Sequence, residues 1–115
     1  MYKILFSDLD ETLLTGHRVP NENIDAIMKI KEKGIRFVPT TGRSFNMIGD
    51  ILKDVGTYNM ENEYSICFNG CLIVENKDNK ILHFEGLEYE IAEELFYKAK
   101  NYDVCVLVFT IDCCY

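Results

Sequence analysis

Two carboxylates and a hydroxyl stand at regular spacing near the start of the sequence. Asp8, Asp10 and Thr12 come shortly after an apolar run of strand type, Ile4 to Phe6. Side chains two residues apart in an extended chain point the same way, so both carboxylates can face one pocket. Two such charges repel each other unless a cation, hydrogen-bond donors or water compensates them. Mg²⁺ is the natural candidate, because this hard ion prefers carboxylate and carbonyl oxygens.

A second group of polar residues follows another apolar run, Ile35 to Pro39. It reads Thr40-Thr41-Gly42-Arg43-Ser44, and a helical pattern comes next, in Met47, Ile48, Ile51, Leu52 and Val55. With Ser44 as the N-cap, this pattern predicts a helix that stops before Gly56. A hydroxyl and a glycine beside a helix N-terminus suit a phosphate, because free backbone N–H groups point there. The alternative is that the threonines and the serine only turn and cap the chain.

The elements that must position these groups are a strand, a helix and a strand. Asn21 can cap a helix that carries Ile24, Ile27, Met28 and Ile30 and that stops at Gly34. A helix between two buried apolar strands predicts a right-handed parallel crossover, which brings both polar groups to the same sheet edge. We therefore expect an α/β protein whose core is a Rossmann-like parallel sheet.

Both polar groups resemble motifs of one family, the haloacid dehalogenase-like phosphatases. The stretch Asp8-Leu9-Asp10-Glu11-Thr12 is similar to the family's first motif, DxDxT after a strand, although Glu11 stands where the commonest form has glycine. Thr41-Gly42-Arg43 looks like the second motif, at a matching spacing from the first. Thr41 rather than Thr40 is the equivalent hydroxyl, because it directly precedes Gly-Arg.

The resemblance implies phosphoryl transfer through an aspartyl-phosphate. Asp8 would be the nucleophile, and Asp10 would protonate the leaving oxygen and then activate water. Mg²⁺ would bind an Asp8 oxygen and the Asp10 backbone carbonyl, and Thr41 would donate a hydrogen bond to a phosphoryl oxygen. Gly42 and Arg43 would help to bind the substrate, with a surface salt bridge as the alternative role of Arg43.

The later part of the chain resembles the Cof-type subgroup, in which the chain leaves the core to build an inserted α/β cap. Tyr64 to Val74 predicts a third core strand that breaks at Asn69-Gly70, and Ile81 to Phe84 completes a hairpin. Asn69 reads as a turn residue or as a polar group at the pocket rim. An amphipathic helix over 88–102 and an apolar strand over 104–111 fit the start of a cap. We expect the core over 1–74, and the hairpin and the beginning of the cap over 75–115.

Two further family motifs have no counterpart in this sequence: a lysine that screens the nucleophile, and an acidic loop that completes the metal site. Gly49 to Asp54 has the letters of that loop, GDxxxD, but it lies on the outer face of a predicted helix and reads as coincidence. We therefore expect the N-terminal portion of such a hydrolase, weak or inactive alone. The alternatives are a non-catalytic remnant that binds phosphate or metal, or packs with a copy or a partner chain, and a receiver-like domain phosphorylated on Asp8.

Composition argues against several classes of function. The 115 residues are 48% apolar, enough to fill a core, and the net charge of −7 argues against a nucleic-acid partner. No apolar run reaches the length of a membrane span and no signal peptide is seen, so we expect no membrane partner and a cytoplasmic protein. The five cysteines, without a CxxC pair, read as thiols. We expect a small phosphorylated metabolite as substrate, and a homo-oligomer that covers an unpaired sheet edge.

Overall fold

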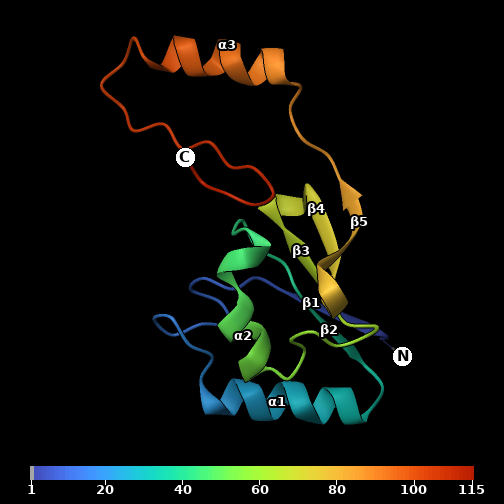
Figure 1. Cartoon of the computed structure of the whole chain (residues 1–115). Helices are drawn as coiled ribbons and strands as arrows, with labels where there is room; N and C mark the ends of the chain where they lie inside the picture. Colours follow the sequence, from blue (N-terminus) through green and yellow to red (C-terminus); the bar gives the residue numbers. More distant parts are fainter. Residues whose placement is uncertain (1) are drawn as a thin grey trace. The chain divides into compact units, whose positions relative to one another are not determined.

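The chain forms two compact units in a computed structural model that describes residues 2–115 (Figure 1). The first unit extends to Phe84, and the second runs from Glu85 to Tyr115. Strands and helices alternate in the first unit, which confirms the expected α/β class. The expected boundary between residues 74 and 75 stays a prediction, and the compact units themselves divide after β5 (Lys80–Phe84).

Two parallel strands form the part of the first unit that carries the predicted site. β1 (Ile4–Ser7) pairs with β2 (Arg36–Pro39) along its whole length, and α1 (Asn21–Glu32) connects them. The expected order of strand, helix and parallel strand is therefore confirmed. The predicted helix cap was wrong, because Asn21 is already helical. Pro20 stands before it with φ −59°, a value that its ring imposes and that suits a helix start.

The two parallel strands differ in burial. The sequence predicts that both are buried, but Ile4, Leu5 and Phe6 of β1 are 43%, 45% and 57% exposed. Phe37 and Val38 of β2 are buried as predicted. Within residues 2–115 β1 pairs with β2 alone, so it is an edge strand, and its apolar side chains remain in contact with water.

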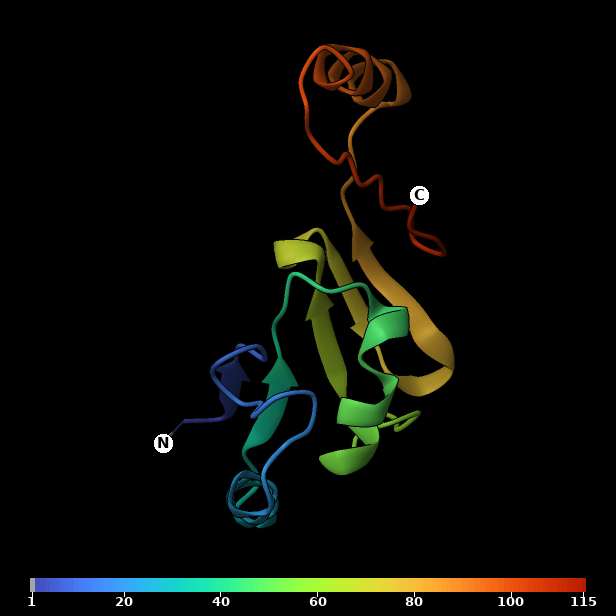
Figure 2. The same cartoon turned by 90° about the vertical axis from the view of Figure 1, so that its left-hand side faces the viewer.

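Three antiparallel strands continue the first unit next to β2. β3 (Tyr64–Cys67), β4 (Leu72–Glu75) and β5 form a sheet in that order. β3 lies beside the end of β2, where Thr40 and Ile66 form a parallel bridge and the N–H of Thr41 donates to the Ile66 carbonyl at 2.9 Å. Figure 2 shows β2 between β1 and β3. The predicted third core strand is confirmed in β3, and the hairpin in β4 and β5. The single strand expected over 64–74 was wrong, because the chain reverses at Asn69-Gly70 and β4 pairs with β3 antiparallel.

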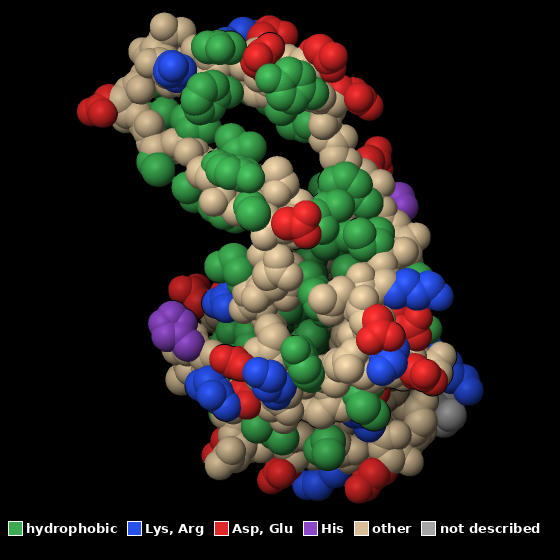
Figure 3. Space-filling model, in the orientation of Figure 1, with side chains coloured by type: hydrophobic (Ala, Val, Ile, Leu, Met, Phe, Trp, Pro, Cys, Tyr) green, Lys and Arg blue, Asp and Glu red, His purple; other side chains and the backbone are tan. Residues whose placement is uncertain are grey.

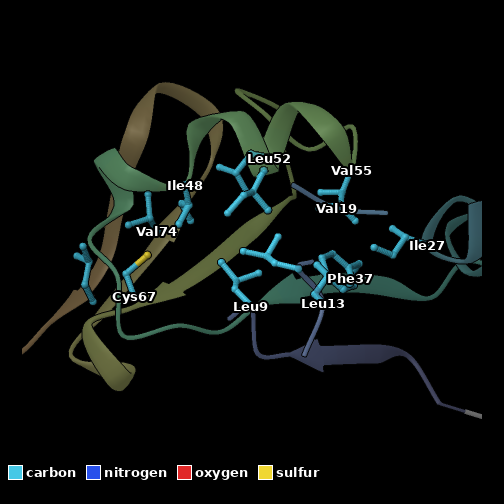
Figure 4. Packing of buried hydrophobic residues seen from close by; sticks show 13 residues of the cluster. Leu9, Leu13, Val19, Ile27, Phe37, Ile48, Leu52, Val55, Cys67 and Val74 are labelled. Atoms are coloured by element: carbon cyan, nitrogen blue, oxygen red, sulfur yellow. The ribbon is translucent and has the colours of Figure 1, made fainter. Parts of the chain in front are cut away.

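The core of the first unit lies between the strands and a short helix, α2 (Gly49–Asp54) (Figure 4). Apolar side chains from the loop after β1, from α1, from the β strands and from α2 meet there. Complete burial of each large apolar side chain stabilises the fold by roughly 1.5–3 kcal/mol. The buried members are Leu9, Leu13, Leu14, Val19, Ile27, Phe37, Ile48, Ile51, Leu52, Val55, Cys67, Leu72 and Val74.

The helix predicted after Ser44 forms in two short pieces. A 3₁₀ turn spans Phe45–Met47, and α2 begins at Gly49, a residue with poor helix propensity. Ile48 between the pieces has φ −112°, outside helical geometry, and this turns Ile48 into the core while Met47 is 58% exposed. Ser44 makes no side-chain capping bond. Ser44 occupies the predicted N-cap position, but the element that follows it is a single 3₁₀ turn and not the predicted longer helix.

The second unit contains a helix followed by an irregular segment. α3 (Tyr89–Ala99) confirms the predicted amphipathic helix. The strand expected over 104–111 was wrong, since this segment is irregular and folds back so that Val108 and Tyr115 exchange backbone hydrogen bonds. An apolar segment becomes a strand only where a neighbour pairs its backbone groups, and no strand among the described residues does so. Figure 3 shows hydrophobic side chains gathered on this unit, and the exposed ones include Leu87, Tyr89, Ile91, Leu95, Tyr97, Tyr102, Val104 and Leu107.

The five cysteines of the chain are free thiols in the structure. Cys67 is fully buried, and this burial raises the pKa of its thiol to about 12. The other four are exposed: Cys71, Cys105, Cys113 and Cys114.

No helix formed by residues 2–115 is both long enough and apolar enough to cross a membrane.

Candidate active site

The loops that follow β1 and β2 meet at one edge of the parallel pair. Because the strands are parallel, their carboxyl ends lie together, with Asp8 after β1 and Thr40 after β2. The N–H of Thr40 donates to the Ser7 carbonyl at 2.8 Å, and the next N–H, from Thr41, donates to Ile66 of β3. Consecutive amides therefore fasten this loop to the strands on either side of it.

A hollow of about 410 Å³ opens at this edge. Asp8 lines it together with Thr41 and Gly42, so the structure brings three of the predicted site residues to one place. Asp10 and Arg43 do not line it. They bind each other beside it, since Arg43 follows the lining residue Gly42 in the chain. The full lining is Phe6, Ser7, Asp8, Thr40, Thr41, Gly42 and Asn69.

Another hollow of similar volume lies at the opposite end of the two strands. Its polar side chains include Lys31 and Glu63, which neutralise each other in an ion pair at 2.8 Å. It holds neither of the predicted carboxylates and no hydroxyl group. We therefore place the candidate active site at the carboxyl ends of the strands.

The loop after β1 is a tight turn built on Leu9, which separates the two carboxylates. Leu9 is fully buried, and its carbonyl accepts the N–H groups of Thr12, Leu13 and Leu14 at 3.3, 3.0 and 2.9 Å. Within this turn Glu11 has φ +59°. A non-glycine residue in this left-handed region costs about 1–2 kcal/mol. The position at which Glu11 replaces the glycine of the resembled motif is thus a strained position of the turn.

Arg43 binds the Asp10 carboxylate with two nitrogens. Its Nε donates to Oδ2 at 2.9 Å, and its Nη2 donates to Oδ1. This hydrogen bonding lowers the pKa of Asp10 below its ordinary value, and the nearby His17 lowers it further by a smaller amount. Of the two roles expected for Arg43, the structure contains the ion pair, at the protein surface, while contact with substrate stays a prediction.

Thr40 and Thr41 both line the hollow, but their hydroxyl groups are in different situations. Thr41 is 3% exposed, and its Oγ1 accepts the N–H of Arg43 at 3.1 Å, which leaves the hydroxyl proton to be donated elsewhere. The Thr40 Oγ1 is buried and has no hydrogen-bond partner within residues 2–115. Thr40 therefore lines the hollow with a hydroxyl that is itself buried, and Thr41 stays the predicted phosphate donor.

Asn69 is the lining residue that the sequence left most open. It lies on the turn between β3 and β4, and its side chain packs against Gly42. Of its two expected positions, a bare turn or the pocket rim, the structure combines both. The only sequence signal for it was the Asn-Gly pair after the third apolar strand.

The GDxxxD stretch lies in α2, as its helical pattern predicts. Asp50 is on the outer face, since its side chain is 74% exposed and pairs with Lys53 at 2.8 Å. The outer-face prediction was wrong for Asp54, which is only 11% exposed because Arg18 covers it and binds both its oxygens. The carboxylates of this stretch are therefore occupied by cations of the protein and do not line the hollow.

The oxygen donors at the hollow and in the turn beside it fit a hard divalent cation in their chemistry. The Asp8 carboxylate and the main-chain carbonyl of Asp10 come from the same turn, and Mg²⁺ is held by such oxygens together with water and substrate. Among residues 2–115, no three His, Cys, Asp or Glu side chains gather closely enough to hold a metal ion. Asp8 and Asp10 remain the predicted metal ligands.

The chain is similar to a family of known hydrolases. A family model described as haloacid dehalogenase-like hydrolase matches residues 5–115. The chain is 31% identical over 99 residues to "Putative phosphatase YxeH" of Bacillus subtilis (strain 168), an alignment that covers 84% of this chain and 36% of the relative. It is 31% identical over 96 residues to a "Putative phosphatase" of Haemophilus influenzae, covering 83% and 34%. The chain thus spans about a third of the length of these curated relatives.

Solved structures share the fold. The phosphatase BT1666 from Bacteroides thetaiotaomicron superposes with a TM-score of 0.80 at 25% identity, over 99% of this chain and 41% of that one. A haloacid dehalogenase-like hydrolase from B. subtilis gives a TM-score of 0.71 at 27% identity, over 87% and 34%. The match of the family model over nearly the whole chain agrees with the parallel strands and with the two motifs at their ends. The chain belongs to the haloacid dehalogenase-like hydrolases.

Proposed function

We propose that this chain forms the phosphoryl-transfer edge of a Mg²⁺-dependent phosphatase of the Cof-type subgroup. Its substrate is a small phosphorylated metabolite of the cytoplasm. The observation that carries the proposal is the hollow that Asp8 shares with Thr41 and Gly42, with Asp10 held beside it. The family to which the chain belongs, and the phosphatase names of its relatives, support the same chemistry.

The reaction begins when a carboxylate oxygen of Asp8 attacks the phosphorus atom of the substrate. The bond between phosphorus and the leaving oxygen breaks, and that oxygen takes a proton from the Asp10 carboxyl. A water molecule then attacks the phosphorus of the aspartyl-phosphate and gives its proton to Asp10. The bond between Asp8 and phosphorus breaks, inorganic phosphate leaves, and both side chains return to their starting state.

Neighbouring groups support these steps. The hydroxyl of Thr41 donates to a phosphoryl oxygen, and Gly42 lines the hollow beside it. The Asp8 carboxylate and the Asp10 carbonyl would hold Mg²⁺, which when bound neutralises negative charge around the transferring group. Arg43 holds the ionised Asp10 carboxylate through two hydrogen bonds and lowers its pKa, so Asp10 has to leave Arg43 and take up a proton before it can protonate the leaving oxygen. The freed guanidinium then lies close to the site where phosphate arrives.

A lysine and an acidic loop complete the site in the resembled family, and no residue of this sequence stands in the context of either. We propose that further chain or a partner supplies them, in keeping with the third of its relatives' length that this chain spans. Loss of a single transition-state donor typically lowers the rate on the order of 10²–10³-fold. Residues 1–115 alone are therefore expected to turn over slowly.

Hydrolysis of p-nitrophenyl phosphate tests the proposal. We expect slow release of nitrophenol that requires Mg²⁺ and that Asp8→Asn abolishes. Asp50→Asn is the matched control, because it makes the same chemical change on the exposed face of α2, outside the hollow, and should keep the rate. Turnover that survives Asp8→Asn contradicts the proposal. A folded chain without any turnover contradicts it too and supports the non-catalytic alternative.

A further inference from the structure

The turn between β3 and β4 has an unusual backbone. Phe68, Asn69 and Gly70 are consecutive residues with positive φ, at +50°, +56° and +103°. Such angles are unfavourable for side chains with a Cβ atom, least so for asparagine and most for a bulky residue such as phenylalanine. Strained backbone of this kind persists where the surroundings hold it, and it gathers at functional sites.

Hydrogen bonds hold this turn against the second motif. The N–H of Phe68 donates to the Arg43 carbonyl at 3.2 Å, and the N–H of Asn69 donates to the Thr41 carbonyl at 3.0 Å. The residues that flank the turn, Cys67 and Leu72, are 0% and 1% exposed. These contacts fix the position of the Asn69 backbone relative to Thr41.

The side chain of Asn69 lies at the hollow and keeps its polar groups available. It lines the hollow together with Asp8, and none of the hydrogen bonds made among residues 2–115 uses its carboxamide. A carboxamide offers two N–H donors and an acceptor oxygen. The amide N–H groups and the amide oxygen of Asn69 are therefore free to bind a ligand in the hollow, where Asp8 would meet its substrate.

Gly42 explains how the carboxamide reaches this position. A Cβ atom added at Gly42 would come within 3.0 Å of the Asn69 Oδ1 and 3.5 Å of its Nδ2. The φ angle of Gly42 lies outside the left-handed region, so the backbone at this position does not require glycine. The missing side chain instead provides the space that the Asn69 carboxamide occupies.

We propose that Asn69 contacts the substrate, with its side-chain amide donating a hydrogen bond to an oxygen of the phosphate held between Asp8 and Thr41. This inference rests on the proposed function, and it adds a phosphate donor to it from a third strand end. The simpler alternative is that asparagine is present only because it tolerates φ +56°. The two accounts differ in what replacement by glycine does, since glycine accepts that angle but has no amide.

The test is the affinity of the full chain for inorganic phosphate in the presence of Mg²⁺, measured by amide chemical shifts in NMR spectra. Asn69→Gly should weaken binding about tenfold, the effect of one hydrogen bond to a charged group, without lowering the unfolding midpoint. Asn69→Asp should weaken it further, because a carboxylate repels phosphate. Asn62→Gly is the matched control, since Asn62 is another left-handed asparagine, at φ +60°, and does not line this hollow; its affinity should be unchanged.

Each outcome separates the two proposals. Phosphate affinity of Asn69→Gly equal to that of the unaltered chain overturns the role of Asn69 and leaves the proposed function standing. Absence of phosphate binding by the unaltered chain overturns both. A tenfold loss in Asn69→Gly, in a chain where Asp8→Asn fails to abolish turnover, supports the contact while contradicting the chemistry assigned to Asp8.

Discussion

Replacement of Glu11 by glycine should stabilise the protein, although it removes a side chain and adds none. Glu11 has φ +59° in the turn that carries the two carboxylates proposed to be catalytic, and a residue with a Cβ atom loses about 1–2 kcal/mol there. Its side chain makes no hydrogen bond or ion pair within the described part of the chain, so the substitution breaks no contact of that kind.

The expected gain is smaller than the strain itself. Glycine has more freedom in the unfolded chain, and that freedom opposes folding by roughly 0.5–1 kcal/mol. The free energy of unfolding should therefore rise by about 0.5–1 kcal/mol for Glu11→Gly. In a domain of this size, such a change raises the midpoint of thermal unfolding by about 2–8 °C.

Urea unfolding followed by circular dichroism measures this free energy. Asp25→Gly is the matched control, because it also replaces one exposed acidic residue by glycine, but within α1. This substitution should lower the free energy of unfolding by about 0.3 kcal/mol, the difference between the helix propensities of aspartate and glycine. The reasoning is refuted if Glu11→Gly proves neutral or destabilising while the control behaves as expected.

Three further predictions follow from burial. Asn76 is 1% exposed; it accepts a hydrogen bond from the Ser65 hydroxyl at 2.8 Å and donates one to the Thr57 carbonyl at 3.0 Å. Asn76→Ala should therefore lower the free energy of unfolding, measured in urea, by about 2–4 kcal/mol. A loss below about 1 kcal/mol would show that these hydrogen bonds contribute little. Burial raises the pKa of Cys67 from 9.0 to about 12, so above pH 9 the unfolded thiol ionises while the folded one stays protonated. Stability should then fall with pH between these values by up to about 1.4 kcal/mol per unit more than in Cys67→Ala, whereas equal slopes would refute the shift. The half-exposed apolar face of β1 should cause concentration-dependent self-association in light scattering, and a monomer at every concentration would argue against this.

The parallel pair could be predicted from the sequence because its signals are local. The apolar run before Asp8, the helical spacing that follows and the second apolar run before Thr41 each specify one element. The short links between them then limit the connection to a crossover. The order of strand, helix and strand therefore makes the two strands parallel, and this brings the two motifs to one edge.

The rest depends on contacts between residues distant in the sequence, and those could not be predicted. The segment 104–111 has the composition of a strand, yet it pairs with no strand among residues 2–115. Asn76 belongs to a polar turn cluster, and only the tertiary structure places it in the core beside Ser65. The Arg43 pairing with Asp10 and the position of Asn69 over Gly42 likewise arise only where separate loops meet.

The central claim is that Asp8 accepts the phosphoryl group, and mass spectrometry can detect this transfer on the protein itself. The chain is incubated with p-nitrophenyl phosphate and Mg²⁺, quenched in acid, digested and mapped by peptide. We predict one phosphoryl group on the peptide that contains Asp8, absent from Asp8→Asn and present in Asp50→Asn. A phosphoryl group found on any other residue, or none in a folded chain, would contradict the account.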